Sequence, residues 1–88
     1  MTVKSRAFPS FWECYASLPQ EVRRRADAQF TLLMADLRHP SLHLKPVGDF
    51  WSVRVTDDYR ALAYREDAVF NWFWIGSHDE YMRLLKRH

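Results

Sequence analysis

Residues 51–75 have the sequence WSVRVTDDYRALAYREDAVFNWFWI, whose pattern is that of a β-sheet. Apolar Trp51, Val53 and Val55 alternate with polar residues, which is typical of a strand with one buried face. Residues 69–75 are apolar on both faces, so this strand is expected to be central or covered on both sides. The stretch therefore predicts an antiparallel meander.

Short polar turns separate the predicted strands. Asp57-Asp58 connects the first strand to a second one at 59–65, and residues 65–67 form the next turn. Residues 43–47 predict a short edge strand, and Gly76 is expected to end the sheet because glycine weakens strands. The predicted sheet is twisted and has three to four strands.

Helices are predicted on both sides of this stretch. Residues 9–18 have near-helical apolar spacing, and Ser17 and Gln20 then resemble the capping residues of a second helix that runs to Leu37. Its apolar stripe consists of Val22, Ala26, Phe30, Leu33, Met34 and Leu37. After the sheet, Ser77-His78-Asp79-Glu80 fits a capping box that begins a short terminal helix. The expected fold class is α+β, with two N-terminal helices packed on the sheet.

The composition indicates one domain over residues 1–88. The chain is 48% hydrophobic and has a net charge of +2, a mild bias towards anionic partners. A single cysteine, Cys14, cannot form an intramolecular disulfide, so a cytoplasmic setting is expected. The first residues lack the apolar run of a signal peptide, and 68–75 is too short to span a bilayer, so no membrane partner is expected. The histidines lack metal-ligand spacing, and no metal or cofactor is predicted.

Four segments in this order resemble the toxins of the RelE/ParE superfamily: 39–45, 51–55, 59–64 and 74–81. The Gly-Ser-His ending is most similar to the YafQ and HigB branches. The resemblance implies a strongly twisted sheet whose concave face holds the active groove. RelE-like members cut mRNA in the ribosomal A site, whereas ParE-like members poison DNA gyrase without nuclease activity. Both kinds are neutralised by an antitoxin.

The resemblance also implies site residues on the strands. Arg60 matches a phosphate-binding arginine, and its alternative role is a structural pairing with Glu80 or Asp58. Arg54 matches a basic position and is otherwise an ordinary solvent-facing strand residue. Ser52 departs from RelE-like enzymes that carry a lysine there, which disfavours a mechanism with lysine as the base.

His78 matches the catalytic histidine of YafQ-like toxins, and a histidine can transfer protons near neutral pH. Tyr81, three residues further on, can stack on a base or assist proton transfer. The alternatives are a solvated first-turn histidine and a core tyrosine. Lys45 and His43 are expected at the rim of the groove as RNA-binding or phosphate-binding groups, whereas His39 marks a helix end.

The aromatic strand predicts a partner surface as well as a core. Phe70, Trp72 and Trp74 are expected on one face and Phe73 and Ile75 on the other. The first three are candidate antitoxin-binding residues, since an apolar surface on a small protein signals a partner.

The leading interpretation is a type II toxin that acts as a metal-independent, ribosome-dependent mRNA endonuclease. Its expected partners are an antitoxin from an adjacent gene, the ribosome and mRNA. The alternatives are a non-enzymatic inhibitor of DNA gyrase and a degenerate member that only binds antitoxin. Residues 23–25, all arginine, predict a solvated helix face, with ribosomal RNA contact as the alternative.

Overall fold

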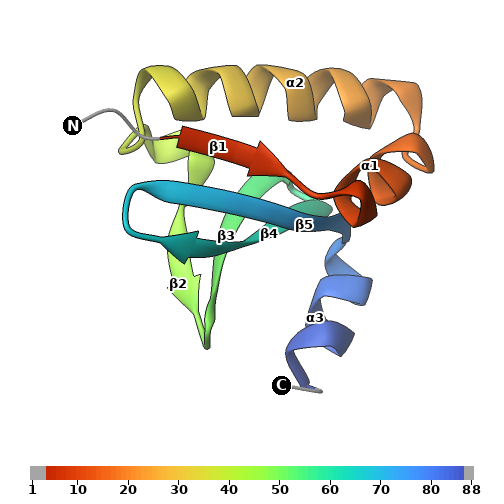
Figure 1. Cartoon of the computed structure of the whole chain (residues 1–88). Coiled ribbons are helices and arrows are strands. Elements are labelled where there is room, and N and C mark those ends of the chain that lie inside the picture. Colours follow the sequence, from red (N-terminus) through yellow and green to blue (C-terminus); the bar gives the residue numbers. More distant parts are fainter. Residues whose placement is uncertain (1–3, 87–88) are drawn as a thin grey trace.

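The computed structural model describes residues 4–86 and confirms the α+β class. In chain order the elements are β1 (Lys4–Ala7), α1 (Pro9–Ala16), α2 (Gln20–Ala35), the 3-10 helix η1 (Pro40–Leu42), β2 (Lys45–Val47), β3 (Phe50–Thr56), β4 (Tyr59–Glu66), β5 (Val69–Ser77) and α3 (His78–Lys86). The strands form one sheet in the order β1-β5-β4-β3-β2. Helices α1 and α2 lie on one side of it and α3 on the other (Figure 1).

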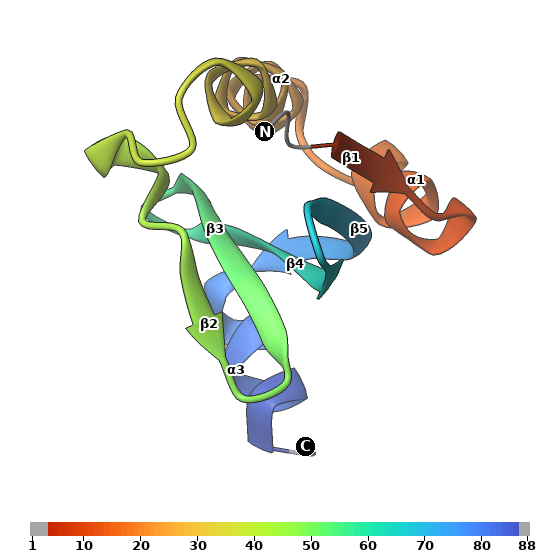
Figure 2. The same ribbon diagram turned by 60° about the vertical axis from the view of Figure 1, so that its left-hand side comes forward.

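The sheet consequently has two buried faces, which we call the α2 face and the α3 face. The α2 face carries the main core beneath α1 and α2, formed by residues such as Val53, Val55, Ala61, Phe70, Trp72 and Ile75. The α3 face carries a smaller cluster of Phe50, Leu62 and Tyr81, against which Phe73 and Trp74 pack. The turned view in Figure 2 shows α2 on one side of the twisted strands and α3 on the other.

Strand β1 is an element that the sequence pattern did not predict. It pairs in parallel with β5, so the sheet is mixed and has five strands rather than three to four antiparallel ones. Residues 4–7 are mostly exposed and show no apolar alternation, because β1 is an edge strand. One side-chain hydrogen bond, from Trp72 Nε1 to Ser5 Oγ at 2.8 Å, fastens it to the core.

A β-bulge in β5 changes the predicted division of the aromatic side chains. Leu62 pairs with Trp74 and Ala63 with Trp72, which leaves Phe73 as the extra residue. Phe73 and Trp74 therefore both lie on the α3 face, while Trp72 belongs to the main core. The prediction that Trp74 shares a face with Trp72 is wrong for this reason.

Gly76 does not end the sheet, because β5 continues to Ser77 and Gly76 pairs with Arg60. A Cβ at this position would lie 2.5 Å from Cζ2 of the Trp74 ring. The glycine is needed because the indole of Trp74 occupies the space of its missing side chain.

Helix α2 begins without the predicted cap. Ser17 is instead the C-cap of α1, where its N–H donates to the carbonyl of Cys14 at 3.1 Å. The residue before α2 is Pro19, which makes no side-chain capping bond. Proline is tolerated at this point because the first N–H groups of a helix have no intrahelical acceptor.

Gln29 ties α2 to the sheet. This buried side chain donates from Nε2 to the carbonyl of Ser41 at 3.1 Å and to that of Arg54 at 2.8 Å. Strand β2 pairs only with 50–52, so at Arg54 no strand on that edge offers a donor. Gln29 supplies the donor that a neighbouring strand would otherwise provide.

We predict that Gln29→Met destabilises the protein by about 1–3 kcal/mol, since two part-buried carbonyls lose their donor. Urea denaturation measures the loss. The matched control is Gln20→Met at the exposed start of α2, which should change the free energy of unfolding by less than about 0.5 kcal/mol. Equal effects of the two substitutions would show that Gln29 does not secure β3.

Candidate functional site

The candidate site lies on the α3 face, where β3 ends, β4 begins and β5 leads into α3. Arg54 and Arg60 are direct cross-strand partners there. Like charges directly opposite each other repel. Arg54 is also paired with the carboxylate of Asp57, three residues further along the chain. The two arginines are thus opposed across β3 and β4, and within residues 4–86 the carboxylate of Asp57 is the one that pairs with them.

One nitrogen of the Arg60 guanidinium group, Nη1, has a structural role. Its Nη1 donates to the carbonyls of Thr56, Tyr59 and Asp57 at 2.6, 2.9 and 3.2 Å, and so secures the β3–β4 turn. Desolvation by burial, followed by the charge of Arg54, lowers the pKa of Arg60 from its ordinary value. An arginine nevertheless stays protonated at neutral pH.

Arg60 therefore has a structural role, as the alternative prediction stated, but its partners are backbone carbonyls of the β3–β4 turn and not carboxylates. Within residues 4–86, Arg60 forms no ion pair with Glu80 or Asp58. Its hydrogen bonds there all come from Nη1, which leaves the donors on Nε and Nη2 for another acceptor.

Arg54 lies at the rim of this cluster. Its side chain is 33% exposed and that of Asp57 is 80% exposed, so their ion pair contributes at most about 1 kcal/mol. The Nη1 of Arg54 lies 3.4 Å from Nε2 of His43. His43 ends η1 in the left-handed conformation, with φ of 46°, and this brings its ring beside the strand.

Lys45 lies on the same face as these groups. It is the direct partner of Ser52 in the β2–β3 pair, and directly opposed residues share a face. Ser52 itself is buried, so a lysine at this position would need a different environment. Lys45 is exposed and supplies the cation on the neighbouring strand instead.

The start of α3 positions His78. The predicted capping box is confirmed in part: Glu80 N–H donates to Ser77 Oγ at 3.3 Å, as predicted. The Glu80 carboxylate reaches back to the Ser77 hydroxyl, which donates to Oε1 at 3.0 Å, and not to the Ser77 N–H. His78 N–H donates to the carbonyl of Asp58 at 2.6 Å, which fixes the helix start against the β3–β4 turn. The backbone of His78 is thereby held against the β3–β4 turn, which Arg60 also secures.

Tyr81 connects His78 to the arginines. Its ring centroid lies 5.6 Å from that of His78, and its side chain is near enough to Arg60 to raise the pKa of that arginine slightly, against the larger lowering effect of burial. Tyr81 is only 5% exposed and packs in the cluster with Phe50 and Leu62, so its ring is also a core residue. The structure therefore brings the four predicted catalytic residues into one neighbourhood.

The three predicted antitoxin-binding residues lie in two different places, two in the main core and one on the α3 face. Phe70 and Trp72 are 0% and 1% exposed, and the Trp72 ring packs against Phe30 of α2. They are core residues that a partner cannot reach, which corrects the prediction. Trp74 is half-buried on the α3 face. Tyr64, not predicted, is 44% exposed there and stacks on Phe73 at 4.6 Å.

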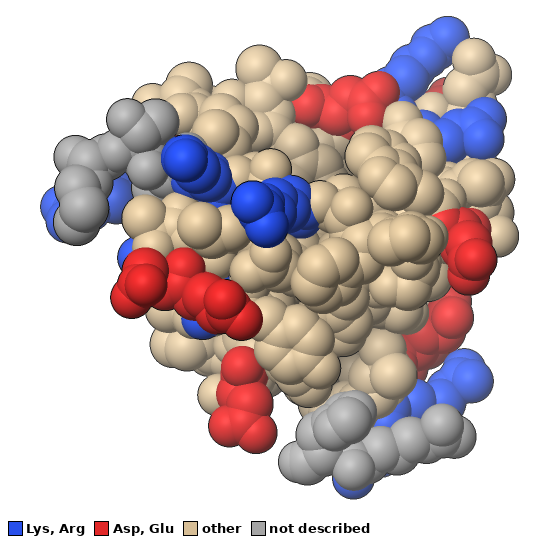
Figure 3. Space-filling model, viewed as in Figure 1, with Lys and Arg blue, Asp and Glu red and all other residues tan. Residues whose placement is uncertain are grey.

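On the other side of the sheet, a groove of about 410 Å³ lies between β1, α1 and α2 and is lined by aromatic residues together with polar ones such as Arg6 and Asp27. Trp12 lines it and is 54% exposed. Figure 3 shows that the middle of the surface on the β1 side is largely uncharged, with acidic and basic side chains around it. Over residues 4–86 no helix is long and apolar enough to cross a membrane, and no group of three His, Cys, Asp or Glu side chains could hold a metal ion.

No protein-family model matches the sequence, and no curated protein sequence matches it. Solved structures do match the fold. A RelE toxin mutant from E. coli in the free state has a TM-score of 0.66 at 16% identity, over 99% of this chain and 98% of its own. YafQ from E. coli BL21(DE3) has a TM-score of 0.69 at 15% identity, over 90% and 97%. A RelB–RelE complex from Methanococcus jannaschii has a TM-score of 0.73 at 10% identity, over 90% and 96%.

The packing role of Tyr81 can be tested by substitution. Tyr81→Ala removes a buried ring and should cost about 3–5 kcal/mol of stability, whereas Tyr81→Phe keeps the packing and should cost less than about 1.5 kcal/mol. Urea denaturation distinguishes the two variants. If Tyr81→Ala were as stable as the parent, α3 would not be anchored by this residue.

Proposed function

We propose, from this shared RelE-type toxin fold, that the chain is the toxin of a type II toxin–antitoxin system and cuts mRNA on the ribosome. The observation that supports it best is the convergence of Arg54, Arg60, His78 and Tyr81 on the α3 face. Three separate segments of the chain contribute them. A merely solvated face would not need this concentration of cationic and proton-transferring groups.

The chemistry proposed is attack of a ribose 2′-oxygen on the adjacent phosphorus. A bond forms between the 2′-oxygen and phosphorus, the bond to the 5′-oxygen breaks, and a proton moves from the attacking to the leaving oxygen. His78 would transfer the proton. Tyr81 is only 5% exposed, so it would assist through its contact with the His78 ring and not by stacking on a base. Arg54 and Arg60 would hold the phosphate, with Lys45 and His43 as supporting cations. The side chains supply these charges themselves, and no cofactor is proposed.

The opposed arginines suit a phosphate for an electrostatic reason. The burial that lowers the pKa of Arg60 raises the energy of an unpaired charge, and Arg54 adds repulsion. An anion held between the two guanidinium groups would relieve both effects. A phosphate fits because the arginine fork binds two of its oxygens at once.

An antitoxin is the second proposed partner. RelE and YafQ toxins have been solved in complexes with RelB and DinJ. On this chain the antitoxin would cover the α3 face. Apolar side chains are accessible there: Tyr64 on the sheet is 44% exposed, Met82 on α3 is 43% exposed, and Trp74 is half-buried. Phe70 and Trp72 would not contact the antitoxin, because they are buried, and would contribute to its binding only by stabilising the fold.

Inhibition of DNA gyrase is the alternative, and the absence of a lysine at position 52 is the observation that favours it. Ser52 is 2% exposed, so the position is part of the packed sheet and not of a catalytic surface. Lys45, its direct partner across β2, offers a cation on the same face. This cation is the reason why the nuclease remains the preferred function.

The test is induction of the protein in bacterial cells, with transcript 5′ ends mapped within minutes. New ends at in-frame positions are expected for the parent and should be absent for His78→Ala. Asp79→Ala is the matched control, because Asp79 is the exposed neighbour on α3, and it should retain cleavage.

Growth arrest with intact transcripts and a DNA-damage response would refute the nuclease and support gyrase as the target. Normal growth on induction would indicate a degenerate member. Cleavage that survives in His78→Ala would keep the nuclease but remove His78 from its active site.

A further inference from the structure

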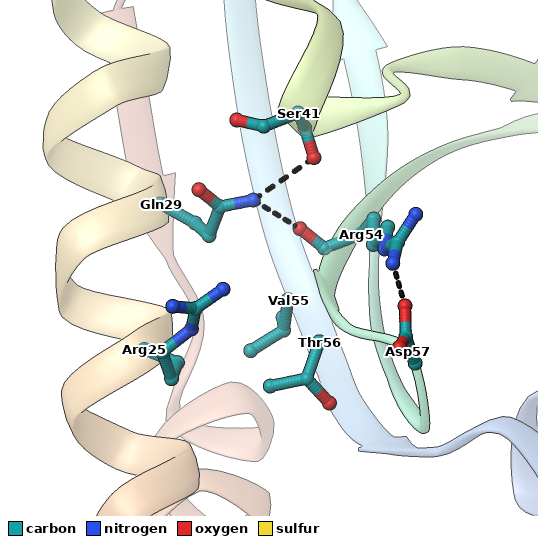
Figure 4. A pocket seen from close by; sticks show the side chains of 7 residues that line it. All are labelled: Arg25, Gln29, Ser41, Arg54, Val55, Thr56 and Asp57. Atoms are coloured by element: carbon teal, nitrogen blue, oxygen red, sulfur yellow. Dashed lines mark hydrogen bonds and ion pairs between the residues drawn. The ribbon is translucent and has the colours of Figure 1, made fainter.

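The guanidinium group of Arg54 contacts two acceptors at the edge of the candidate site. Its Nη1 lies 3.4 Å from Nε2 of His43, and its Nη2 is paired with the carboxylate of Asp57. Figure 4 shows the Arg54 side chain turned away from α2 and directed at Asp57. Arg54 is therefore held at two of its nitrogens, by the end of η1 through His43 and by the β3–β4 turn through Asp57.

The chemistry of the contact between His43 and Arg54 decides which group donates. A guanidinium group has N–H donors and no acceptor, and it stays protonated in proteins. His43 Nε2 must therefore accept, so the imidazole is neutral and carries its proton on Nδ1. A protonated imidazole has donors on both nitrogens, and at this distance it would place a second positive charge against Arg54.

The backbone around His43 fixes the position of its ring. His43 is the C-cap of η1, where its N–H donates to the carbonyl of Pro40 at 3.3 Å. Its φ of 46° lies in the left-handed region, which histidine adopts more often than most other side chains do. Gln29 binds the carbonyls of both Ser41 in η1 and Arg54 in β3, so η1 is anchored to the strand that carries Arg54.

We propose that His43 is a positioning residue, which in its neutral form holds the Arg54 guanidinium in place for the phosphate. The assignment rests on the proposed function and changes one part of it, because His43 then serves as a hydrogen-bond acceptor and not as a supporting cation. Arg54 needs such a partner, since it is directly opposite Arg60 and the two like charges repel. The contacts with His43 and Asp57 use two of the five guanidinium donors and leave three for phosphate oxygens.

The proposed role depends on pH, because histidine titrates near neutral pH. Helix η1 packs against β3 and α2. The titratable and charged groups on and beside it are Arg54 on β3, Asp57 in the β3–β4 turn, Lys45 on β2, Arg25 on α2 and His39 at the start of η1. Within residues 4–86, Arg54 is the one whose side chain lies within hydrogen-bond distance of the His43 ring. Protonation of His43 should therefore release Arg54 from η1, and cleavage should weaken as the pH falls.

Two unbranched substitutions distinguish an acceptor from a cation at position 43. His43→Gln keeps an acceptor without a charge, whereas His43→Lys keeps a charge without an acceptor. In a cleavage assay with bacterial ribosomes and a short mRNA, His43→Gln should retain the kcat of the parent within about twofold. His43→Lys should lower kcat about fivefold with little change in KM, as expected for one exposed charged contact. The reverse order of the two variants would overturn the proposal and make His43 a supporting cation, and equal activity of both with the parent would also overturn it.

The pH profile gives a readout that a merely structural role would not change. Cleavage by the parent should fall more steeply than cleavage by His43→Gln between about pH 7.5 and 5.5, because glutamine does not titrate there. His78 is present in both proteins, so its titration contributes equally to the two profiles. Parallel profiles would refute the role of His43.

Nitrogen-15 NMR of the free protein tests the contact without RNA. At about pH 8, above the ordinary titration range of histidine, the His43 ring should carry its proton on Nδ1 and have an unprotonated Nε2. Arg54→Ala should abolish this preference, whereas the matched control Arg24→Ala, an exposed arginine on α2, should keep it. A proton on Nε2 in the parent would overturn the proposal whatever the cleavage assay shows. Intact transcripts in induced cells, with the expected tautomer present, would refute the proposed nuclease and not the contact.

Discussion

The packing of β5 between two layers is the constraint on which the other features depend. A regular strand sends alternate side chains to opposite faces, so Trp72 and Trp74 would share a face. The bulge at Phe73 places Trp74 on the α3 face and returns Ile75 to the main core. Both faces of the sheet acquire apolar residues in this way. Helix α3 then has a surface to pack on, and it keeps its N-terminus beside the β3–β4 turn.

That arrangement assembles the site from parts that are individually ordinary. Arg60 secures a turn, Tyr81 fills a small core and His78 begins a capped helix. Each is fixed by a structural task, and together these tasks hold the cationic and proton-transferring groups in place without a dedicated loop. Such preorganisation is what a phosphate-cleaving site requires, because charges already in position need no rearrangement during the reaction.

The sequence predicted the features that depend on local pattern: the alternation of 51–55, the α2 helix and the capping box at Ser77. It did not predict β1, because an exposed polar edge strand has no apolar period. It also missed the bulge, since 72–75 are apolar at every position and give no alternation to follow. The resemblance to known toxins identified the neighbouring arginines, histidine and tyrosine.

We propose that the α3 face, with Arg54, Arg60 and His78, acts on mRNA in the ribosome. A cryo-EM reconstruction of the protein on a bacterial ribosome, with mRNA methylated at the 2′-oxygens, tests it most directly. We expect a phosphate at about 3 Å from the arginine donors and the adjacent 2′-oxygen next to the His78 ring. Ribosome binding through the β1 groove, with the α3 face away from mRNA, would contradict it, and so would an absence of binding.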